Sequence, residues 1–290
     1  MEPKLDLRSG ETTDPPLGPL FSVVVPTHNR PELLIYAIAS VVAQTFQDWE
    51  CIVVDDGGTL SFDIGTDPRV RTISLASNRG AGAARNAGVG AARGTWIVFL
   101  DDDDEFLEDR LKSIVCYLEG DIVVLSETQL RNRQRGALPL GPQIVVDQIA
   151  NAFTPHLGTV AVHRDVFIPF HESYRTCEDV DWWLRISQTA RVTMIAGVGY
   201  RMRQHVGLRH LSGDNERLRD SKRLLEDHAA YFATHNRARA FRQMRIGVYA
   251  ARLGNKRDAA KSFGASLRSR LTIQAIRRMV ALLGQSAKTR

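Results

Sequence analysis

The sequence contains few cysteines and no apolar run of membrane-spanning length. Its three cysteines, Cys51, Cys116 and Cys177, lie far apart without paired spacing, which excludes a disulfide framework and a cysteine zinc site. The longest apolar stretch, residues 33–43, has a helical period and is shorter than the roughly 20 residues that cross a bilayer. The chain begins Met-Glu-Pro-Lys, without the apolar segment of a signal peptide. We therefore expect a cytoplasmic protein with reduced thiols.

The composition is that of an ordinary globular protein with an uneven charge distribution. Hydrophobic residues make up 43% and charged residues 24%, which excludes wholesale disorder and favours one or two domains. Residues 237–290 contain 14 Lys and Arg and one acidic residue, Asp258, whereas the rest of the chain has 24 basic and 32 acidic residues. The pattern predicts an acidic body with a basic C-terminal end.

Short apolar runs alternate with helical patterns along most of the chain. The runs predict strands over residues 21–25, 51–54, 70–75, 96–100, 121–125, 158–163, 191–195 and 199–203. The helical periods predict helices over residues 31–44, 80–92, 107–118 and 177–189. Such alternation is typical of an α/β fold with a mostly parallel sheet flanked by helices on both faces. From residue 214 onward the sequence predicts only helices, including a hairpin over residues 249–267 joined at Gly254-Asn255.

Acidic residues stand where predicted strands end. Asp55 and Asp56 follow the second strand, and four consecutive aspartates, residues 101–104, follow the fourth. Ligands of open α/β sheets bind outside the carboxyl ends of the strands, so this edge is the predicted site. Four adjacent carboxylates repel one another unless a cation or water neutralises them, and oxygen-only clusters suit Mg²⁺ or Mn²⁺. A solvated acidic loop is the alternative interpretation.

Two glycine-containing segments are weaker indicators of a nucleotide site than the acidic run. Residues 78–88 suggest a phosphate loop but lack the Gly-x-x-x-x-Gly-Lys-Ser/Thr spacing, so packing of a small-residue helix on the sheet is the better interpretation of their Gly and Ala positions. Their arginines and the helix N-terminus can still face an anion. Residues 55–58, Asp-Asp-Gly-Gly, read either as nucleotide-binding acids or as an ordinary turn.

Taken together, six motifs in order resemble the family 2 glycosyltransferases of the GT-A fold. They occupy residues 22–30, 44–50, 53–57, 78–88, 99–104 and 178–182. The resemblance implies an inverting transfer of a sugar from a nucleoside-diphosphate donor, usually a UDP-sugar, to a hydroxyl acceptor, with Mn²⁺ or Mg²⁺. The resemblance covers about residues 20–210 and implies a GT-A domain (20–212). The four prolines of residues 1–19 predict a flexible leader, and the helical, basic remainder (213–290) is expected to be an extension outside the family pattern. Within the GT-A domain, residues 20–120 form the nucleotide-binding half and residues 121–212 the acceptor half.

The resemblance assigns roles to individual residues. Those expected around the nucleotide are Pro26, Thr27, Asn29, Asp55, Asp56, Arg85, Asp101 and Asp102, with Thr27 and Asp56 at the base. Asp103 resembles the direct metal ligand of an Asp-x-Asp element and Asp101 a second ligand, although the four-acid run leaves the register open by one.

The resemblance also implies a general base for the acceptor hydroxyl and a residue that contacts the donor diphosphate. Asp179 resembles the general base, with Glu178 and Asp181 as rivals and a first-turn helix acid as the structural alternative. His205 is expected over the diphosphate or as a further metal ligand, although a lone histidine is more often a surface or packing residue.

Other classes of protein share parts of this pattern. A sugar-1-phosphate nucleotidyltransferase should have a basic Gly-rich loop after the first strand, where this chain has Pro-Thr-His-Asn-Arg. A non-catalytic sugar-nucleotide-binding scaffold would keep the fold but has no need of the complete acid set. For the acceptor, the expected setting is polysaccharide or cell-envelope glycan assembly, with glycosylation of a natural product or a protein as the alternative.

The basic end predicts an interaction surface. Residues 237–290 can contact anionic lipids at the inner face of the membrane, which suits a lipid-linked acceptor. Docking on the acidic body, or a contact in an oligomer, is the stronger alternative. No aromatic-rich basic motif supports nucleic-acid binding.

Overall fold

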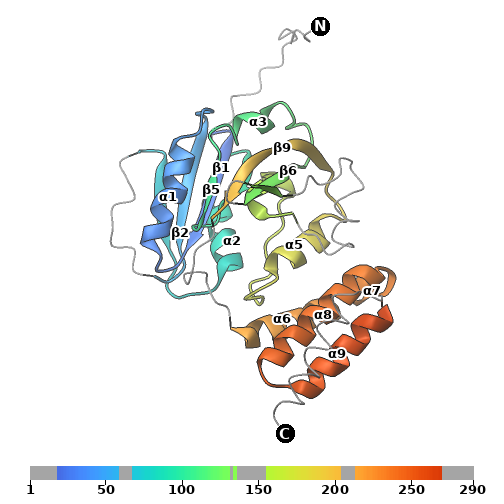
Figure 1. Cartoon of the computed structure of the whole chain (residues 1–290). Coiled ribbons are helices and arrows are strands. Elements are labelled where there is room, and N and C mark those ends of the chain that lie inside the picture. Colours follow the sequence, from blue (N-terminus) through green and yellow to red (C-terminus); the bar gives the residue numbers. More distant parts are fainter. Residues whose placement is uncertain (1–17, 59–66, 131–132, 136–154, 204–212, 270–290) are drawn as a thin grey trace.

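The computed structural model describes residues 18–58, 67–130, 133–135, 155–203 and 213–269, and shows a mixed α/β body with helices gathered at one end (Figure 1). Residues 1–17 of the expected leader, and His205, lie outside the described residues. No described helix is long and apolar enough to span a membrane.

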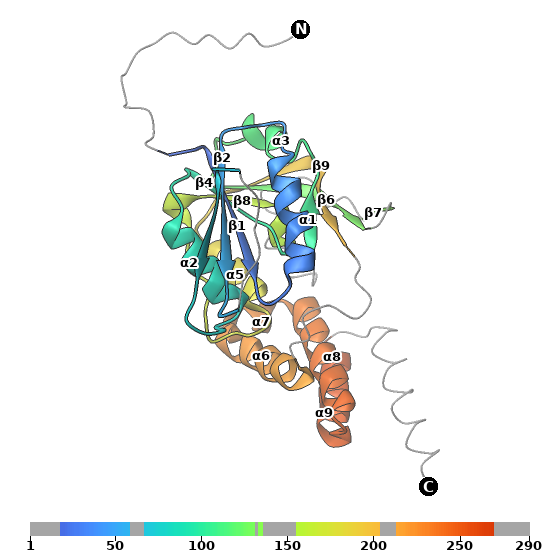
Figure 2. The same ribbon diagram turned by 90° about the vertical axis from the view of Figure 1, so that its left-hand side faces the viewer.

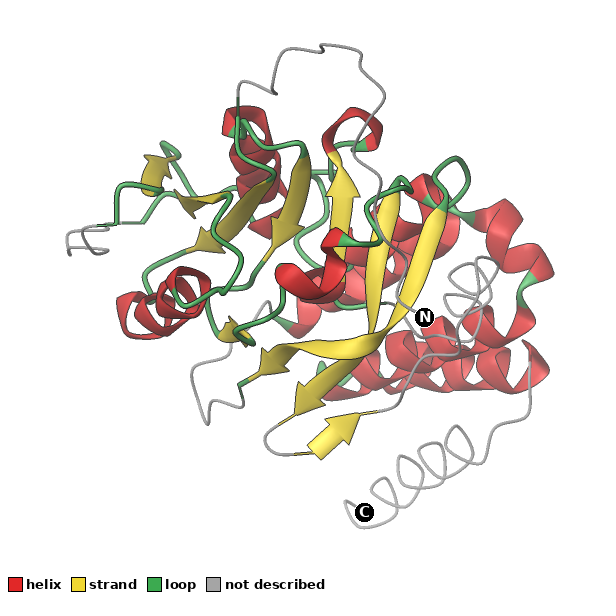
Figure 3. Ribbon diagram, turned by 90° about the horizontal axis from the view of Figure 1, so that it is seen from above, coloured by secondary structure: helices red, strands yellow, loops and turns green. Residues whose placement is uncertain are grey.

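One sheet forms the centre of the body, in the strand order β3-β2-β1-β4-β8-β6-β9-β5, with β7 paired to β6 (Figure 3). The strands are β1 (Phe21–Thr27), β2 (Trp49–Asp55), β3 (Val70–Ser74), β4 (Trp96–Phe99), β5 (Asp104–Phe106), β6 (Ile122–Leu130), β7 (Arg133–Arg135), β8 (Val160–His163) and β9 (Val192–Met202). The four parallel ladders, β1 with β2 and β4, β2 with β3, and β6 with β9, are each longer than any antiparallel one. The expected mostly parallel α/β fold is therefore confirmed.

Helices cover both faces of the sheet (Figure 2). The described helices are α1 (Pro31–Val42), α2 (Ala81–Ala91), α3 (Lys112–Val115), α5 (Glu178–Ile186), α6 (Asp214–Asp227), α7 (Ala229–Thr234), α8 (Asn236–Arg252) and α9 (Lys256–Ser269). Successive side chains of β1 point to opposite faces of the sheet. Val23 and Val25 pack with α1 on one face, whereas Val24 packs with α2 and α5 on the other. Burial on both faces explains why these strands read as continuous apolar runs.

Three expected elements differ from the structure. The helix predicted over residues 107–118 is reduced to α3, because the Gln44 side chain donates to the Leu107 carbonyl at 2.7 Å and accepts from the Leu111 amide at 3.0 Å. The Leu107 carbonyl and the Leu111 amide therefore bind the Gln44 side chain in place of partners in a helix. The two strands predicted at residues 191–195 and 199–203 are one strand, β9, whose pairing with β6 contains a bulge.

The C-terminal helices form one layer against α5 (Figure 1). Helices α8 and α9 make the predicted hairpin, with Gly254 at φ +77° in the turn between them. Leu224, Phe232 and Ala238, from α6, α7 and α8, are buried in the same apolar cluster as Trp183 of α5. The helical extension therefore shares the core of the body from α6 to the start of α8, whereas Met244, Ala250, Ala259 and Phe263 of α8 and α9 form a separate apolar cluster.

Candidate active site

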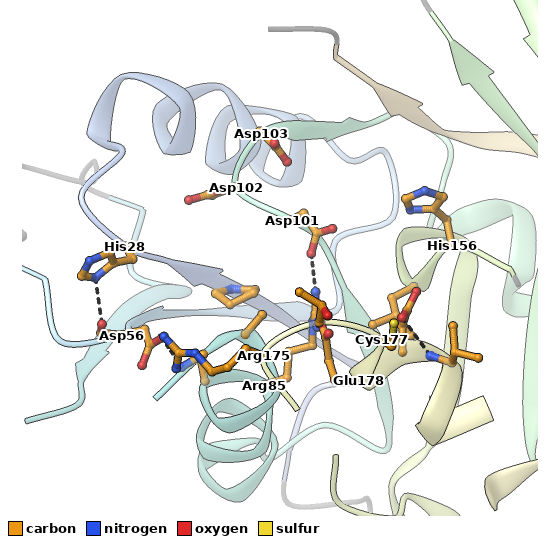
Figure 4. Close-up of a pocket in the computed structure, with 18 of the residues that line it drawn as sticks. His28, Asp56, Arg85, Asp101, Asp102, Asp103, His156, Arg175, Cys177 and Glu178 are labelled. Carbon is orange, nitrogen blue, oxygen red and sulfur yellow. Dashed lines mark hydrogen bonds and ion pairs between the residues drawn. The ribbon is translucent and has the colours of Figure 1, made fainter. Parts of the chain in front are cut away.

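A cavity of about 560 Å³ opens at the carboxyl ends of β1 and β4 (Figure 4). Such a volume lies within the usual range of small-molecule sites. The expected site residues that line it are Pro26, Thr27, Asp56, Arg85, Asp101, Asp102, Asp103 and Asp179. Asn29 and Asp55 are not among the lining residues, and the Asp55 carboxylate accepts from the Gly58 amide at 2.9 Å within its own turn.

The Asp56 side chain binds the backbone immediately before α2. One carboxylate oxygen accepts from the Arg79 amide and the other from the Gly80 amide, both at 2.7 Å. Gly80 has φ +95°, a conformation that L side chains rarely adopt, so the close turn depends on glycine there. His28, beside Asp56 in Figure 4, places its Nδ1 2.9 Å from the Asp56 carbonyl oxygen. Asp56 thus fixes the loop between β3 and α2 at the cavity wall.

The tetra-aspartate run alternates between two environments. Asp102 is fully buried, accepts from the Thr27 hydroxyl at 2.7 Å and pairs with Arg30 at 2.5 Å. Burial raises the pKa of Asp102 to about 7, and the neighbouring Asp103 and Asp101 charges add to the rise. Asp102 therefore lies in the cavity lining with its carboxylate already bound to Thr27 of β1 and to Arg30.

Asp101, Asp103 and Asp104 each offer a carboxylate oxygen, and these oxygens lie within 4.8 Å of one another. Asp104 also accepts from the Tyr200 hydroxyl and from the Arg203 amide. Burial, followed by the Asp101 and Asp103 charges, raises the pKa of Asp104 to about 8. A divalent cation would relieve this crowding of negative charge, and three carboxylate oxygens are the donor set of a hard cation, so the residues fit Mn²⁺ or Mg²⁺.

Arg85 connects the acidic run to α5. Its guanidinium is nearly fully buried and donates to Asp101 at 2.7 Å and to Glu178 at 2.9 Å (Figure 4). Burial works to raise the pKa of Asp101, but the Arg85 charge outweighs it and the pKa lies below its usual value. Burial raises the pKa of Glu178 in spite of the same arginine. The ion pairs fix both carboxylates in position.

The three acids at the start of α5 have different surroundings. Glu178 is bound to Arg85, and Asp181 is 3% exposed and paired with Arg185 and His228. Asp179 is half-buried, lines the cavity, and accepts from the Val180 amide at 2.8 Å. Among these three acids, Asp179 is the cavity-lining carboxylate with no ion pair in the described part of the chain.

The sequence did not indicate that the C-terminal helices reach the cavity. Arg217, Phe241, Arg242, Arg245 and Tyr249 line it from α6 and α8. The last four fall on one face of α8 at helical spacings of three, four and eight, and this spacing was the available signal. Arg175, which donates to the Asn78 side chain at 2.5 Å, was also missed.

Comparison with known proteins places the site in context. Residues 22–156 match the family model described as Glycosyl transferase family 2. The Escherichia coli protein "UDP-Glc:alpha-D-GlcNAc-diphosphoundecaprenol beta-1,3-glucosyltransferase WfgD" is 25% identical over 191 residues, which cover 61% of this chain and 73% of that protein. Further curated proteins named as glycosyltransferases are 30–39% identical, but this chain spans only about a third of their length.

Solved structures share the fold. Staphylococcus aureus TarS in complex with UDP-GlcNAc has a TM-score of 0.61 at 18% identity, covering 88% of this chain and 82% of that one. The mannosyltransferase PcManGT from Pyrobaculum calidifontis, in complex with GDP-Man and Mn²⁺, has a TM-score of 0.55 at 18% identity, covering 98% and 84%. At these identities the matches establish a common fold.

Proposed function

Because this chain belongs to glycosyl transferase family 2, we propose that it transfers a sugar from a nucleoside-diphosphate donor to a hydroxyl acceptor with inversion at the anomeric carbon. The observation that carries the proposal is a single cavity that holds the acidic cluster, Arg85 and Asp179. The rival classes are a nucleotidyltransferase, which should have a basic Gly-rich loop after β1 where this chain has Pro-Thr-His-Asn-Arg, and a non-catalytic scaffold, which has no need of the complete acid set.

In the proposed reaction Asp179 accepts the proton of the acceptor hydroxyl as its oxygen attacks the anomeric carbon. The bond between that carbon and the β-phosphate oxygen breaks, and the nucleoside diphosphate leaves with the bonding electron pair. Asp101 and Asp103 would hold Mn²⁺ or Mg²⁺, which stabilises negative charge on the leaving diphosphate. Arg85 keeps Asp101 and Glu178 in place and so fixes the carboxylates on both sides of the reacting atoms.

The donor and acceptor are proposed from the relatives. TarS binds UDP-GlcNAc and WfgD is named for a UDP-Glc donor, so we take a UDP-sugar as the donor. WfgD is also named for a lipid-diphosphate acceptor, which supports a lipid-linked acceptor in cell-envelope glycan assembly. A natural product or a protein is the alternative acceptor. Placing residues 237–290 at the membrane surface follows from a lipid-linked acceptor and is proposed with it.

Calorimetric titration of UDP, GDP, dTDP and CDP, with and without Mn²⁺, tests the donor half of this proposal. We expect one diphosphate to bind in a metal-dependent manner, and Asp103→Ala to abolish the metal-dependent part. The control is Asp165→Ala, because the Asp165 side chain is 80% exposed and does not line the cavity. The absence of binding by every nucleotide would overturn the transferase proposal, and binding without transfer of any sugar would favour a scaffold.

A further inference from the structure

Helix α8 presents a cationic and aromatic face to the cavity. Phe241, Arg242, Arg245 and Tyr249 all line it, and they recur at spacings that place them on one side of the helix. Tyr249 is buried, whereas Arg245 is exposed and Arg242 half-buried. The two guanidinium groups therefore line the cavity where a ligand can reach them, and that of Arg245 lies near the Phe241 and Tyr249 rings.

Six of the described arginines line the cavity. Arg30 and Arg85 are paired with the carboxylates of the acidic run or of α5. Arg217 pairs with Asp214, and Arg175 donates to the Asn78 side chain. Arg242 donates to the Cys177 sulfur at 3.4 Å, and Arg245 donates to the Tyr249 hydroxyl. Neither Arg242 nor Arg245 has a carboxylate within 4 Å among the residues that the structure describes. A guanidinium has five N–H donors, so both retain donors for an anion.

Arg242 lies near the proposed base Asp179. The contact between Arg242 and Cys177 places that guanidinium beside the residue that immediately precedes Glu178 and Asp179. Thr27 and Asp56, expected around the nucleotide, line the cavity from β1 and from the residue after β2, whereas Arg242 and Arg245 line it from α8. The carboxylates of residues 101–104 would attract a cation that binds the donor diphosphate. A second cationic centre at α8 therefore suits a second anion.

We propose that Arg242 and Arg245 bind a phosphate group carried by the acceptor, while Phe241 and Tyr249 contact the part of the acceptor next to it. Guanidinium forks match phosphate oxygens bidentately, and charge-assisted hydrogen bonds of this kind are among the strong ones. This inference rests on the proposed transferase function and specifies the acceptor class of the same site. It also gives the basic α8 a role within the active site.

The test uses the full chain, first without and then with saturating UDP and Mn²⁺. The probes are N-acetylglucosamine 1-phosphate and geranyl phosphate, which carry phosphate on a sugar and on an apolar chain, together with inorganic phosphate. Methyl N-acetylglucosaminide serves as the phosphate-free comparison. The wild type should bind the two carried phosphates in the presence of UDP, more tightly than inorganic phosphate and far more tightly than the methyl glycoside.

The variants are Arg242→Gln combined with Arg245→Gln, and Arg245→Gln alone, whose exposed side chain contacts the Phe241 and Tyr249 rings on its own helix. The matched control is Arg252→Gln, on the same helix but outside the cavity lining. The double variant should lose about tenfold or more in affinity for the carried phosphates, the effect of one charge-assisted hydrogen bond, with UDP affinity unchanged. The control should bind like the wild type.

Four results would overturn the inference. They are undiminished phosphate binding by the double variant, no binding of carried phosphates by the wild type, inorganic phosphate binding as tightly as the carried phosphates, and an equal loss of UDP affinity in the double variant. The last would assign the arginines to the donor. Failure of UDP to bind the wild type would instead overturn the proposed function, and the titrations without UDP would still report on the anion site.

Discussion

Arg85 on α2 donates a hydrogen bond to Glu178 on α5 at 2.9 Å, although the two residues lie 93 positions apart in the sequence. The same guanidinium binds Asp101, so one buried cation joins the acidic run to the helix that carries Asp179. The donor side and the base side of the proposed reaction are therefore held at a fixed separation by one side chain.

Arg85→Met should destabilise the protein and reduce transfer. It leaves the Glu178 carboxylate, 14% exposed, and the more exposed Asp101 carboxylate without this counter-charge. Breaking a buried pair costs about 3–5 kcal/mol, and we expect a loss toward the lower end of that range. The matched control is Arg79→Met, because Arg79 is half-exposed, pairs with Glu172 at the surface, and should cost less than about 1 kcal/mol. Urea unfolding measures both. Equal stability losses in the two variants would contradict the assigned role of Arg85.

Asp179→Asn should abolish transfer with little effect on UDP binding. The amide keeps the shape of the side chain but cannot accept a proton, so the loss should appear in kcat, by about 10²-fold or more. The matched control is Asp181→Asn, two residues further along α5. Asp181 does not line the cavity and pairs with His228 and Arg185, so its loss should reduce stability and leave transfer largely intact. The reverse ranking of the two variants would move the base to Asp181.

The stability of the metal-free protein should fall as the pH rises from about 6 to 8 and then level off. Burial raises the pKa of Asp102 to about 7 and of Asp104 to about 8, whereas an unfolded chain has aspartates near 4. The folded protein thus holds protons that the unfolded chain has released, and raising the pH through the folded-state pKa values favours unfolding. Mn²⁺ should raise Tm more at about pH 9 than at about pH 6, because the carboxylates are then charged.

Thermal melts across this pH range, with and without Mn²⁺, check that expectation. Asp104→Asn should flatten the pH dependence of the metal-free protein, since it removes the group with the higher of the two raised pKa values. The exposed Asp165 supplies the control, Asp165→Asn. A Tm that rises between about pH 6 and 8 in the metal-free wild type would contradict the proposed crowding of charge.

Much of the nucleotide half was predictable because its signals are local. Apolar runs such as residues 51–54 marked buried strands, and the acids after them marked the edge where the cavity lies. Strand β5 was not predictable, since Asp104–Phe106 has no apolar run and is a strand only through pairing with β9. The shortening of the helix at residues 107–118 depends on Gln44, which reaches it from more than sixty residues away.

The sequence alone does not show which of the four aspartates could bind a metal ion together. Four identical residues carry no sequence signal for which of them turn inward, and the contact of Asp102 with Thr27 separates it from its neighbours. The contribution of α6 and α8 to the cavity was likewise hidden, because it depends on packing against α5 and not on any motif. The expectation that the GT-A domain ends near residue 212 rests only on where the last sequence motifs lie.

Gly88→Ala should test whether the Gly- and Ala-rich α2 is a packing surface. A Cβ at residue 88 would lie 2.3 Å from a methyl of Val24 and 3.1 Å from one of Val54, so the substitution should cost about 1–3 kcal/mol. Gly90→Ala, two residues along the same helix, meets nothing within 4 Å and should stabilise the protein by about 0.4–1 kcal/mol. Opposite signs in urea unfolding are the expected result, and destabilisation by both would contradict it.

Asp220 gives the helical extension a measurable role in positioning the site. It is fully buried on α6, and one carboxylate oxygen accepts from the backbone amides of Arg175 and Thr176, both at 2.8 Å. These residues lead directly into Cys177, which has φ +65°, and then into α5 with Asp179. The segment before the proposed base is therefore held by a side chain from the extension.

Asp220→Ala should leave two amides without their acceptor, at a cost of about 1–3 kcal/mol each, and should lower kcat while UDP affinity is retained. Asp220→Asn keeps one carbonyl acceptor and should restore part of kcat, which a purely electrostatic role would not allow. Asp258→Ala, on α9 in a surface pair with Lys222, is the control and should change neither quantity. If Asp220→Ala lowers stability but kcat of the folded protein is unchanged, the extension supports the fold without positioning Asp179.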